Sequence, residues 1–213
     1  MQNDLFTKEE QDAWNTYFYP NTDVFINNLG IKDNKELDKK EAEITFERLV
    51  ELNENPIVGN FDSNHLIEIH KYIFQDLYPW AGKYRTVHTG KNNSSFCDYK
   101  EIDQRLKYEL NLMNEDTKNV SNIDMFKNLI ADYFIVLLNI HPFRDGNGRS
   151  IREFLREFTV VKTRALNLGE YNLDWSLVSE EELDKYMPLA RFIKSPIEIL
   201  ISKAIVEDKT KSI

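Results

Sequence analysis

The feature that most constrains this chain is a polar nonamer set between two apolar segments of helical periodicity. The nonamer runs from His141 to Arg149 with the sequence His-Pro-Phe-Arg-Asp-Gly-Asn-Gly-Arg, and Arg152 follows three residues later. Apolar residues recur at helical spacing over residues 125–140, and the same period resumes over residues 150–158. The first helix should end at His141, because a residue that precedes proline disfavours helical backbone. The sequence therefore predicts a helix, a polar loop and a second helix.

The loop combines residue types that suit a phosphate ligand. Gly146 and Gly148 flank Asn147 and let the backbone approach an anion closely, while the following helix points its N-terminus at the same place. Arg149 and Arg152 lie three residues apart on one helix face, where they can contact two phosphate groups. Cations at a helix N-terminus oppose the helix dipole, and a bound polyphosphate would explain that cost.

Three further side chains of the loop complete the pattern. Asp145 is a hard oxygen ligand suited to Mg²⁺, which takes one or two carboxylates plus substrate phosphates. His141 can accept a proton near neutral pH, and the neighbouring arginines favour its neutral form. Phe143 is expected to face the core and anchor the loop. Each fragment alone has a structural alternative, such as an ordinary Gly-Asn-Gly turn, but their conjunction within residues 141–152 favours a nucleotide-using transferase.

This string resembles the signature of the Fic family (filamentation induced by cAMP), His-x-Phe-x-Asp/Glu-Gly-Asn-Gly-Arg-x-x-Arg, and every fixed position is present. Residues 78–85, Tyr-Pro-Trp-Ala-Gly-Lys-Tyr-Arg, are similar to the family's aromatic-x-Trp-Ala-Gly-x-x-Arg segment. Residues 19–22 and 28–31 resemble the N-terminal part of small bacterial members. The resemblance implies a helical Fic fold and an enzyme that transfers AMP from ATP to a Tyr, Thr or Ser hydroxyl of a target protein, with release of pyrophosphate.

The resemblance also implies a role for each loop residue. His141 would deprotonate the target hydroxyl, and Asp145 would hold Mg²⁺ that bridges the phosphates of ATP. The residues implied to bind phosphate are Gly146, Asn147 and Gly148 at the α-phosphate, and Arg149 and Arg152 at the leaving β/γ end. The Doc subgroup, which phosphorylates its targets, has Ala-Asn-Lys-Arg where this chain has Gly-Asn-Gly-Arg, so nucleotidyl transfer is favoured. Transfer of another nucleoside monophosphate, phosphocholine or phosphate, removal of AMP, and a non-catalytic nucleotide-binding module are the alternatives.

A single β-hairpin is predicted beside this loop. Residues 84–89 are rich in β-formers, residues 90–93 favour a turn, and residues 94–99 could pair back. The segment resembles the family's flap, which pairs with the backbone of the target and presents its hydroxyl to the base. The residues expected in this docking role are Thr86, Val87, His88, Ser95 and Phe96. A plain surface hairpin is the alternative.

Regulation is expected to come from outside the chain. Family members are often restrained by a Ser/Thr-x-x-x-Glu-Gly/Asn motif, whose glutamate pairs with the second arginine of the signature. Residues 50–55 lack the hydroxyl of that motif, and residues 176–181 lack its last position; Ser179 and Glu182 are better explained as a capping box. We therefore expect a separate small antitoxin that supplies the inhibitory glutamate, with a truncated or unrestrained form as the alternative.

Two weaker patterns carry no site. His65 and His70 are five residues apart, which is the wrong spacing for the zinc histidines of a metalloprotease helix, so we expect ordinary helix residues. Cys97 is the single cysteine, which excludes an intrachain disulfide and a multi-cysteine metal site. A reducing cytoplasm is then the simplest location, although secretion into a host stays open.

Composition bounds the remaining possibilities. A net charge of −9 argues against binding of nucleic acid or anionic membranes, and no apolar stretch is long enough to span a bilayer. A chain of 213 residues with 41% hydrophobic content suits one domain with a sizeable core. The expected fold is all-α with one short β-hairpin, divided into an N-terminal helical extension (1–60), a Fic core (61–165) and C-terminal helices (166–213). The oligomeric state stays open.

Helical patterns place most of the secondary structure. Besides the two helices around the loop, helices are expected at 7–14, 35–52, 63–75, 101–113, 179–192 and 196–206. The first should begin with a capping box formed by Thr7 and Glu10. The tail around residues 209–211 is expected to fray.

Overall fold

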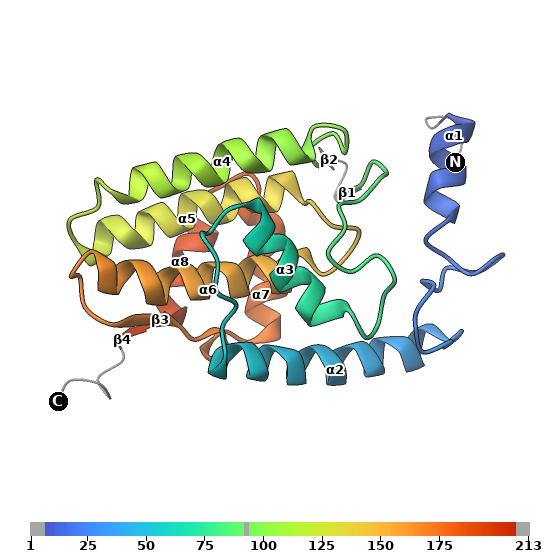
Figure 1. Ribbon diagram of the computed structural model, residues 1–213, viewed down its shortest axis with the longest axis horizontal. Coiled ribbons are helices and arrows are strands. Elements are labelled where there is room, and N and C mark those ends of the chain that lie inside the picture. The colour runs from blue at the N-terminus through green and yellow to red at the C-terminus, as the bar shows by residue number, and fades with distance from the viewer. Residues whose placement is uncertain (1–6, 92–93, 208–213) are drawn as a thin grey trace.

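The computed structural model describes residues 7–91 and 94–207, and it is mainly helical, as predicted (Figure 1). The helices are α1 (Lys8–Asn15), α2 (Asn34–Glu54), α3 (Ser63–Phe74), α4 (Ile102–Thr117), α5 (Ile123–Ile140), α6 (Asn147–Ala165), α7 (Glu180–Ala190) and α8 (Ser195–Ala204), with a 3-10 turn at Trp175–Leu177. The expected turn residues 92–93 and tail residues 209–211 lie outside the described residues. The helices predicted on either side of the polar loop are α5 and α6.

Helix α5 lies at the centre of the fold. It packs against α4, α6 and α8, while α3 packs on α6 and α2 packs on α3. In Figure 1 the long helices α4, α5 and α6 lie one below another from top to bottom, and α2 runs along the lower edge of the molecule. The apolar side chains of α5 recur at helical spacing and are buried, among them Phe126, Ile130, Phe134 and Leu137. Burial of each such side chain contributes about 1.5–3 kcal/mol, which fixes the end of α5 from which the loop begins.

Side-chain caps set the start of most helices. Thr7 with Glu10 and Ser179 with Glu182 form complete capping boxes, which confirms both predictions. The side chains of Asp33, Asp62 and Asn122 accept the amide of the third helical residue at the starts of α2, α3 and α5. A side-chain oxygen at this position satisfies an amide that the helix itself leaves unpaired. Helices α4, α6 and α8 begin without such a cap, and at α6 the preceding residue, Gly146, has no side-chain oxygen to provide.

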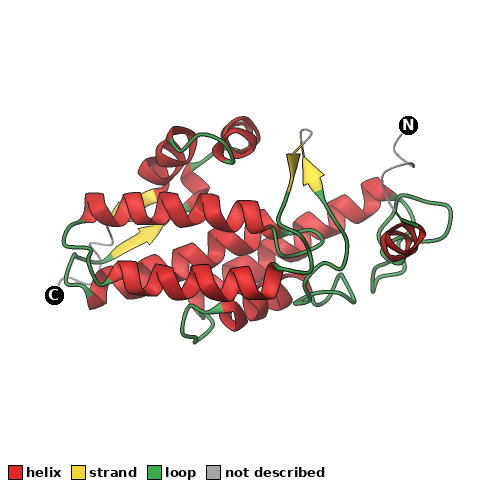
Figure 2. Cartoon of the chain, turned by 90° about the horizontal axis from the view of Figure 1, so that it is seen from above, coloured by secondary structure: helices red, strands yellow, loops and turns green. Residues whose placement is uncertain are grey.

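The hairpin is present but shorter than predicted. Strand β1 (Gly90–Lys91) pairs with β2 (Ser94–Ser95), and Figure 2 shows both strands projecting from the helical body. Residues 84–89 do not form the expected strand. Their path is fixed instead by the end of α5, where the Arg85 amide donates to the carbonyl of Pro142 at 2.9 Å.

A second small sheet was not predicted. Strand β3 (Tyr171–Leu173) pairs in antiparallel register with β4 (Ile205–Glu207), so α8 ends at Ala204 and not at residue 206. The pairing joins residues more than 30 positions apart, and the strands are too short for alternation to reveal them. Leu173 is fully buried, and the sheet closes the C-terminal part of the chain against α6 and α8.

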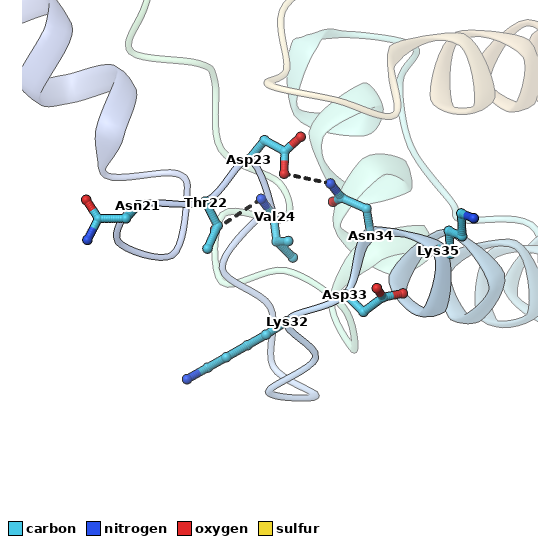
Figure 3. A pocket seen from close by; sticks show the side chains of 8 residues that line it. All are labelled: Asn21, Thr22, Asp23, Val24, Lys32, Asp33, Asn34 and Lys35. Carbon is cyan, nitrogen blue, oxygen red and sulfur yellow. Dashed lines mark hydrogen bonds between the residues drawn. The ribbon is translucent and has the colours of Figure 1, made fainter.

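The N-terminal segment meets α2 at a surface hollow (Figure 3). Residues 21–24 and 32–35 line it, and Asn34 donates to Asp23 across it at 2.8 Å. None of these residues belongs to the polar loop, so the hollow is separate from the candidate active site. Within the described part of the chain, no helix is both long enough and apolar enough to cross a membrane.

Candidate active site

His141 occupies the last position of α5 and turns the chain into the loop. Its backbone is left-handed, with φ 49° and ψ 62°, and its amide donates to the carbonyl of Leu137 at 3.0 Å. Pro142 excludes a further helical turn at this point, and the left-handed conformation is uncommon for a residue other than glycine. The predicted helix end is therefore confirmed. The backbone turn directs the histidine away from the axis of α5 and toward the hairpin.

Arg85 holds this turn in place through hydrogen bonds to its carbonyls. Its side chain is 1% exposed, and it donates to the carbonyls of His141 (2.8 Å), Ile140 (3.2 Å), Val87 (2.8 Å) and Cys97. The last carbonyls of a helix have no partner within it, so a cation at this end is stabilised by both hydrogen bonds and the helix dipole. Desolvation lowers the pKa of the guanidinium. Arg85, at the end of the Trp-Ala-Gly segment, thus connects α5, the loop and the hairpin by hydrogen bonds.

The loop is closed by a reciprocal amide contact. Asn147 is 2% exposed; its Oδ1 accepts the Phe143 amide at 2.9 Å, and its Nδ2 donates to the Phe143 carbonyl at 2.8 Å. Phe143 is fully buried, which places it where the sequence predicted an anchor. Because both ends of the Asn147 amide are occupied within the loop, its side chain supports the loop in this structure, and its predicted contact with phosphate would require breaking that pair.

Gly146 is required by the geometry, whereas Gly148 has helical backbone. Gly146 has φ +75°, and a Cβ there would lie 2.3 Å from the ring of Phe74. Gly148 lies in the first turn of α6, where a Cβ would meet Nη1 of Arg152 at 3.3 Å. The absence of a side chain at Gly148 therefore keeps the approach to Arg152 clear. Only the first glycine takes the left-handed conformation that the sequence allowed for both.

Asp145 reaches solvent at the mouth of the loop. Its Oδ1 accepts the Gly146 amide at 2.6 Å. The surrounding protein raises the pKa of this carboxyl by desolvation, and repulsion from Glu41 raises it further. Among the described residues, no group of three or more His, Cys, Asp or Glu side chains could hold a metal ion. A single accessible carboxylate nevertheless fits Mg²⁺ that arrives with substrate phosphates, since such ions keep water and phosphate ligands.

The two predicted phosphate-binding arginines have different surroundings. Arg149 forms an ion pair with Glu41 of α2, donates to Thr45 at 3.2 Å and lies 4.8 Å from the ring centre of Phe74. Tyr78 also donates to Glu41. Sequence reasoning missed Glu41, because the contact spans more than 100 residues and α2 carries many similar acidic side chains.

Arg152 has no carboxylate partner among the described residues. Desolvation lowers its pKa to about 10, and repulsion from Arg149 adds to the effect. Its backbone carbonyl accepts Nε1 of Trp175 at 3.2 Å, which fixes the helix but leaves the guanidinium charge uncompensated. An uncompensated, partly buried cation beside an uncapped helix N-terminus is suited to an anion.

His70 also supports the loop, although its spacing from His65 indicated only an ordinary helix residue. Nδ1 accepts the Gly82 amide at 2.8 Å, so Nε2 carries the proton and donates to the Asp145 carbonyl at 3.1 Å. The ring stacks on Phe143 with centres 3.8 Å apart. Burial lowers the pKa of His70 to about 3, which keeps it neutral.

Arg144, at a variable position of the signature, ties the N-terminal segment to the loop. Its guanidinium lies 4.2 Å from the ring centre of Trp14 and 4.8 Å from that of Phe25, with Tyr17 and Phe18 also in contact. Cation–π contacts of this kind contribute about 0.5–2 kcal/mol each. Sequence reasoning missed this contact, and the concentration of aromatic residues between positions 14 and 25 is the signal that could have indicated it.

The hairpin lies over His141. The ring of Phe96 is parallel to the imidazole, with centres 3.7 Å apart and an interplanar angle of 3°. The other predicted docking residues are more scattered. Thr86 bonds the Tyr17 hydroxyl, His88 lies 3.6 Å from Glu10, and Val87 is 2% exposed. Val87 is thus part of the core and offers no surface for docking. The first strand of the hairpin was expected at residues 84–89, whereas it lies at Gly90–Lys91. Phe96 lies against the imidazole of His141, and Ser95 precedes it at the end of β2, so the docking role of these two residues stays a prediction.

Comparison with known proteins identifies the family. Residues 60–159 match the Fic/DOC family. The chain is 37% identical to protein adenylyltransferase VbhT of Bartonella schoenbuchensis over 79% of its own length, but it spans only 34% of that protein. It is 36% identical to "Probable protein adenylyltransferase y4lH" of Sinorhizobium fredii, over 66% of this chain and 73% of the relative.

Solved structures show the same fold. The BepC protein of Bartonella tribocorum with bound AMPPNP superposes with a TM-score of 0.77 at 23% identity, over 92% of this chain and 98% of that chain. The N-terminal Fic domain of a cell filamentation protein from Bartonella quintana with bound ADP gives 0.75 at 25% identity, over 91% and 95% of the two chains. Together with the signature loop and its helical frame, these similarities show that the chain belongs to the Fic/DOC family.

Proposed function

We propose that this chain is a protein adenylyltransferase, which transfers AMP from ATP to a hydroxyl side chain of a target protein and releases pyrophosphate. The observation that carries the proposal is the arrangement at the start of α6. His141 lies at one side of the loop, an N-terminus without a side-chain cap lies at its centre, and the uncompensated Arg152 lies one turn along the helix. The names of the curated relatives support the same activity.

The residues of the chain divide the reaction between them. His141 accepts the proton of the target hydroxyl as its oxygen attacks the α-phosphorus of ATP. The new O–P bond forms while the bond from the α-phosphorus to pyrophosphate breaks. Negative charge therefore develops on the leaving pyrophosphate, the β/γ end of ATP. Arg152 is placed to bind that end, and the backbone amides at the start of α6 are placed to bind the α-phosphate. Arg149 can join it only if its ion pair with Glu41 opens.

Asp145 is the residue that would hold Mg²⁺. Its carboxylate is accessible, and the ion would supply charge neutralisation for the phosphates when it is bound with ATP. The raised pKa of Asp145 weakens the carboxylate as a ligand at low pH, because the proton competes with the metal. Removal of divalent cations with a chelator should therefore abolish transfer, and excess Mg²⁺ should restore it.

The position of the label distinguishes this function from its alternatives. Lysate of the source organism is incubated with Mg²⁺ and either α-labelled or γ-labelled ATP, with the His141→Ala variant in parallel. We expect a labelled protein band only with α-label and only with wild-type chain, and mass spectrometry of that band should show added AMP. Label from γ-phosphate would indicate phosphorylation, competition by GTP, UTP or CTP would indicate another nucleotide, and ATP binding without any transfer would indicate a non-catalytic module.

We also infer a separate small protein that restrains the enzyme through a glutamate. The inference is supported by the missing inhibitory motif and by the uncompensated charge of Arg152. Glu41 does not take this role, because it pairs with Arg149. Co-purification of the chain from its source with a small acidic partner, and loss of that partner on Arg152→Ala, would support the inference; full activity in the presence of every co-purified protein would contradict it.

The reaction is proposed for the cytoplasm, where ATP is available and the free thiol of Cys97 stays reduced. Secretion into a host cell is the alternative. Fractionation of the source organism, followed by detection of the chain in cytoplasmic and external fractions, decides between the two.

A further inference from the structure

Three flat groups from different parts of the chain are layered at the mouth of the site. The ring of Phe96 lies parallel on the imidazole of His141, with centres 3.7 Å apart. Arg191 is the residue that follows α7. Its guanidinium carbon lies 4.0 Å from the centre of the Phe96 ring. Phe96 therefore has a cation on one side and the proposed base on the other. Stacking of a guanidinium on an aromatic ring is favourable, and Arg is the cation best suited to it.

Arg191 also fixes the backbone of the hairpin. Its Nη2 donates to the carbonyl of Ser95 at 3.0 Å, and its Nη1 reaches the carbonyl of Ser94 at 3.4 Å. Both acceptors belong to β2, the strand that leads directly into Phe96. The planar fork of arginine can hold two carbonyls and a ring face at once, which lysine cannot do.

The other side of Arg191 is joined to the helix that carries His141. Its Nε donates to Oδ1 of Asn139 at 3.2 Å, and Nδ2 of Asn139 donates back to the carbonyl of Arg191 at 3.4 Å. Asn139 lies two residues before His141, in the last turn of α5. The amide of Cys97 in turn donates to the carbonyl of Asn139 at 3.0 Å, so the hairpin and the helix end are linked on both sides of Phe96.

We propose that Arg191 is a positioning residue that latches the hairpin over His141, so that Phe96 sets the orientation of the imidazole and the distance between the hairpin and the base. The inference rests on the proposed adenylyl transfer. The consequence is specific: Arg191 affects the step in which the base meets the target hydroxyl, and it does not affect ATP binding, because the phosphate-binding groups lie at the start of α6. Loss of about 1 Å of positioning at a catalytic group typically costs ~10²-fold in rate.

The first test is spectroscopic and needs no target protein. The chain has four histidines, so selective isotope labelling gives few ring signals, and His141→Ala assigns the one of interest. A ring stacked on Phe96 should show its carbon-bound protons shifted upfield by the ring current. Phe96→Leu, which keeps apolar volume, should remove this shift, and Phe96→Tyr should keep it. We expect Arg191→Ala to move the His141 signal toward its position in Phe96→Leu.

The second test separates the latch from simple loss of structure. Arg191→Ala and Arg191→Lys should reduce AMP transfer by about 10- to 100-fold at saturating ATP while the affinity for ATP stays at the wild-type value. Arg164→Ala is the matched control, because Arg164 is an exposed arginine near the far end of α6 whose guanidinium donates to Glu170 at 3.2 Å, and transfer should not change. Thermal melting of each variant verifies folding, and Arg191→Lys replaces Arg191→Ala if the latter unfolds.

The outcomes of the two proposals are distinguishable. If wild-type chain transfers no AMP, the proposed function fails, and the spectroscopic test still decides whether Arg191 holds Phe96 on His141. If wild-type chain transfers AMP but Arg191→Ala keeps both the upfield His141 signal and the wild-type rate, the latch is overturned. A parallel loss of ATP affinity and transfer would also overturn it, because that result would indicate a general structural role.

Discussion

The charged side chains at the start of α6 and those in its next two turns differ in whether an opposite charge compensates them. In the middle of the helix, Arg156 donates to Glu153 at 2.6 and 2.8 Å, and Glu157 bonds His65 of α3 at 2.9 Å. All four side chains are nearly buried, and each has a partner. At the start of the helix, Arg152 has no carboxylate partner among the described residues. The paired charges compensate one another within α6 or across to α3, whereas the charge of Arg152 would be compensated by the proposed phosphate ligand.

This difference matters because buried charge is costly without a partner. A buried ion pair that loses one member leaves the other unpaired, which costs about 3–5 kcal/mol. Natural folds therefore leave a partly buried cation uncompensated only where something else supplies the opposite charge. On this reasoning, substitutions in the paired region should affect stability, and substitutions at the start of α6 should affect function.

The largest effect is expected at His141, at the functional end. Substitution His141→Ala removes the proposed base, and general-base assistance is worth about 10²–10⁴-fold in rate. We expect AMP transfer to fall by that factor while the urea midpoint of unfolding changes little, since the Arg85 bonds to the backbone carbonyls of this turn remain. Transfer at the wild-type rate would show that another group takes the proton.

The paired region should respond in the opposite sense. Substitution Arg156→Met keeps the length of the side chain but leaves Glu153 buried without its cation. We expect a loss of about 3–5 kcal/mol in the free energy of unfolding, measured by urea denaturation. The affinity for ATP should be unchanged at temperatures where the variant is folded. A small loss, below about 1 kcal/mol, would show that Glu153 accepts a proton or water at little cost.

The same substitution one turn earlier sharpens the comparison. Arg152→Met removes a cation whose neighbouring charge is Arg149, so stability should be equal to wild type or slightly higher. The affinity for ATP should fall by about 10- to 100-fold, the value of one charge-assisted hydrogen bond. Calorimetric titration with a non-hydrolysable ATP analogue measures this loss. Equal destabilisation by Arg152→Met and Arg156→Met would remove the distinction between the two regions.

Local chemistry explains which parts of this site could be predicted from the sequence. The end of α5 follows from Pro142, the turn follows from Gly146, and the two helices follow from their apolar period. These features depend on neighbours within a few residues, and the structure confirms the helix end and the left-handed glycine.

The remaining contacts depend on packing between distant segments. Glu41 contacts Arg149, Arg191 contacts Phe96 and His70 contacts the Asp145 carbonyl only because segments far apart in the sequence lie side by side. No local pattern distinguishes Glu41 from the other acidic residues of its helix. The strand expected at residues 84–89 was wrong for the same reason, because the backbone of Tyr84 and Arg85 pairs with Pro142 and Phe143 and not with the second half of the hairpin.

The smallest predicted effect concerns the pH dependence of the free energy of unfolding, through His70. His70 supports the loop but carries no charge, and burial lowers its pKa to about 3, below about 6.5 for an exposed imidazole. Between these values the unfolded chain binds a proton that the folded chain does not. The contribution of His70 is therefore complete above pH 6.5 and is lost as the pH falls, by about 2 kcal/mol between pH 7 and pH 5.

Urea denaturation at several pH values tests this expectation. The wild-type chain should lose stability on acidification through this window, and His70→Gln should lose about 2 kcal/mol less, whatever its stability at pH 7. His88→Gln is the matched control for the loss of an imidazole, because His88 lies near the hairpin with about a third of its side chain exposed. An unchanged slope in His70→Gln would mean that the folded chain protonates His70 readily. Nδ1 would then carry a proton and could not accept the Gly82 amide, so the rigid support inferred for the motif would have to come from Asn147 and Phe143.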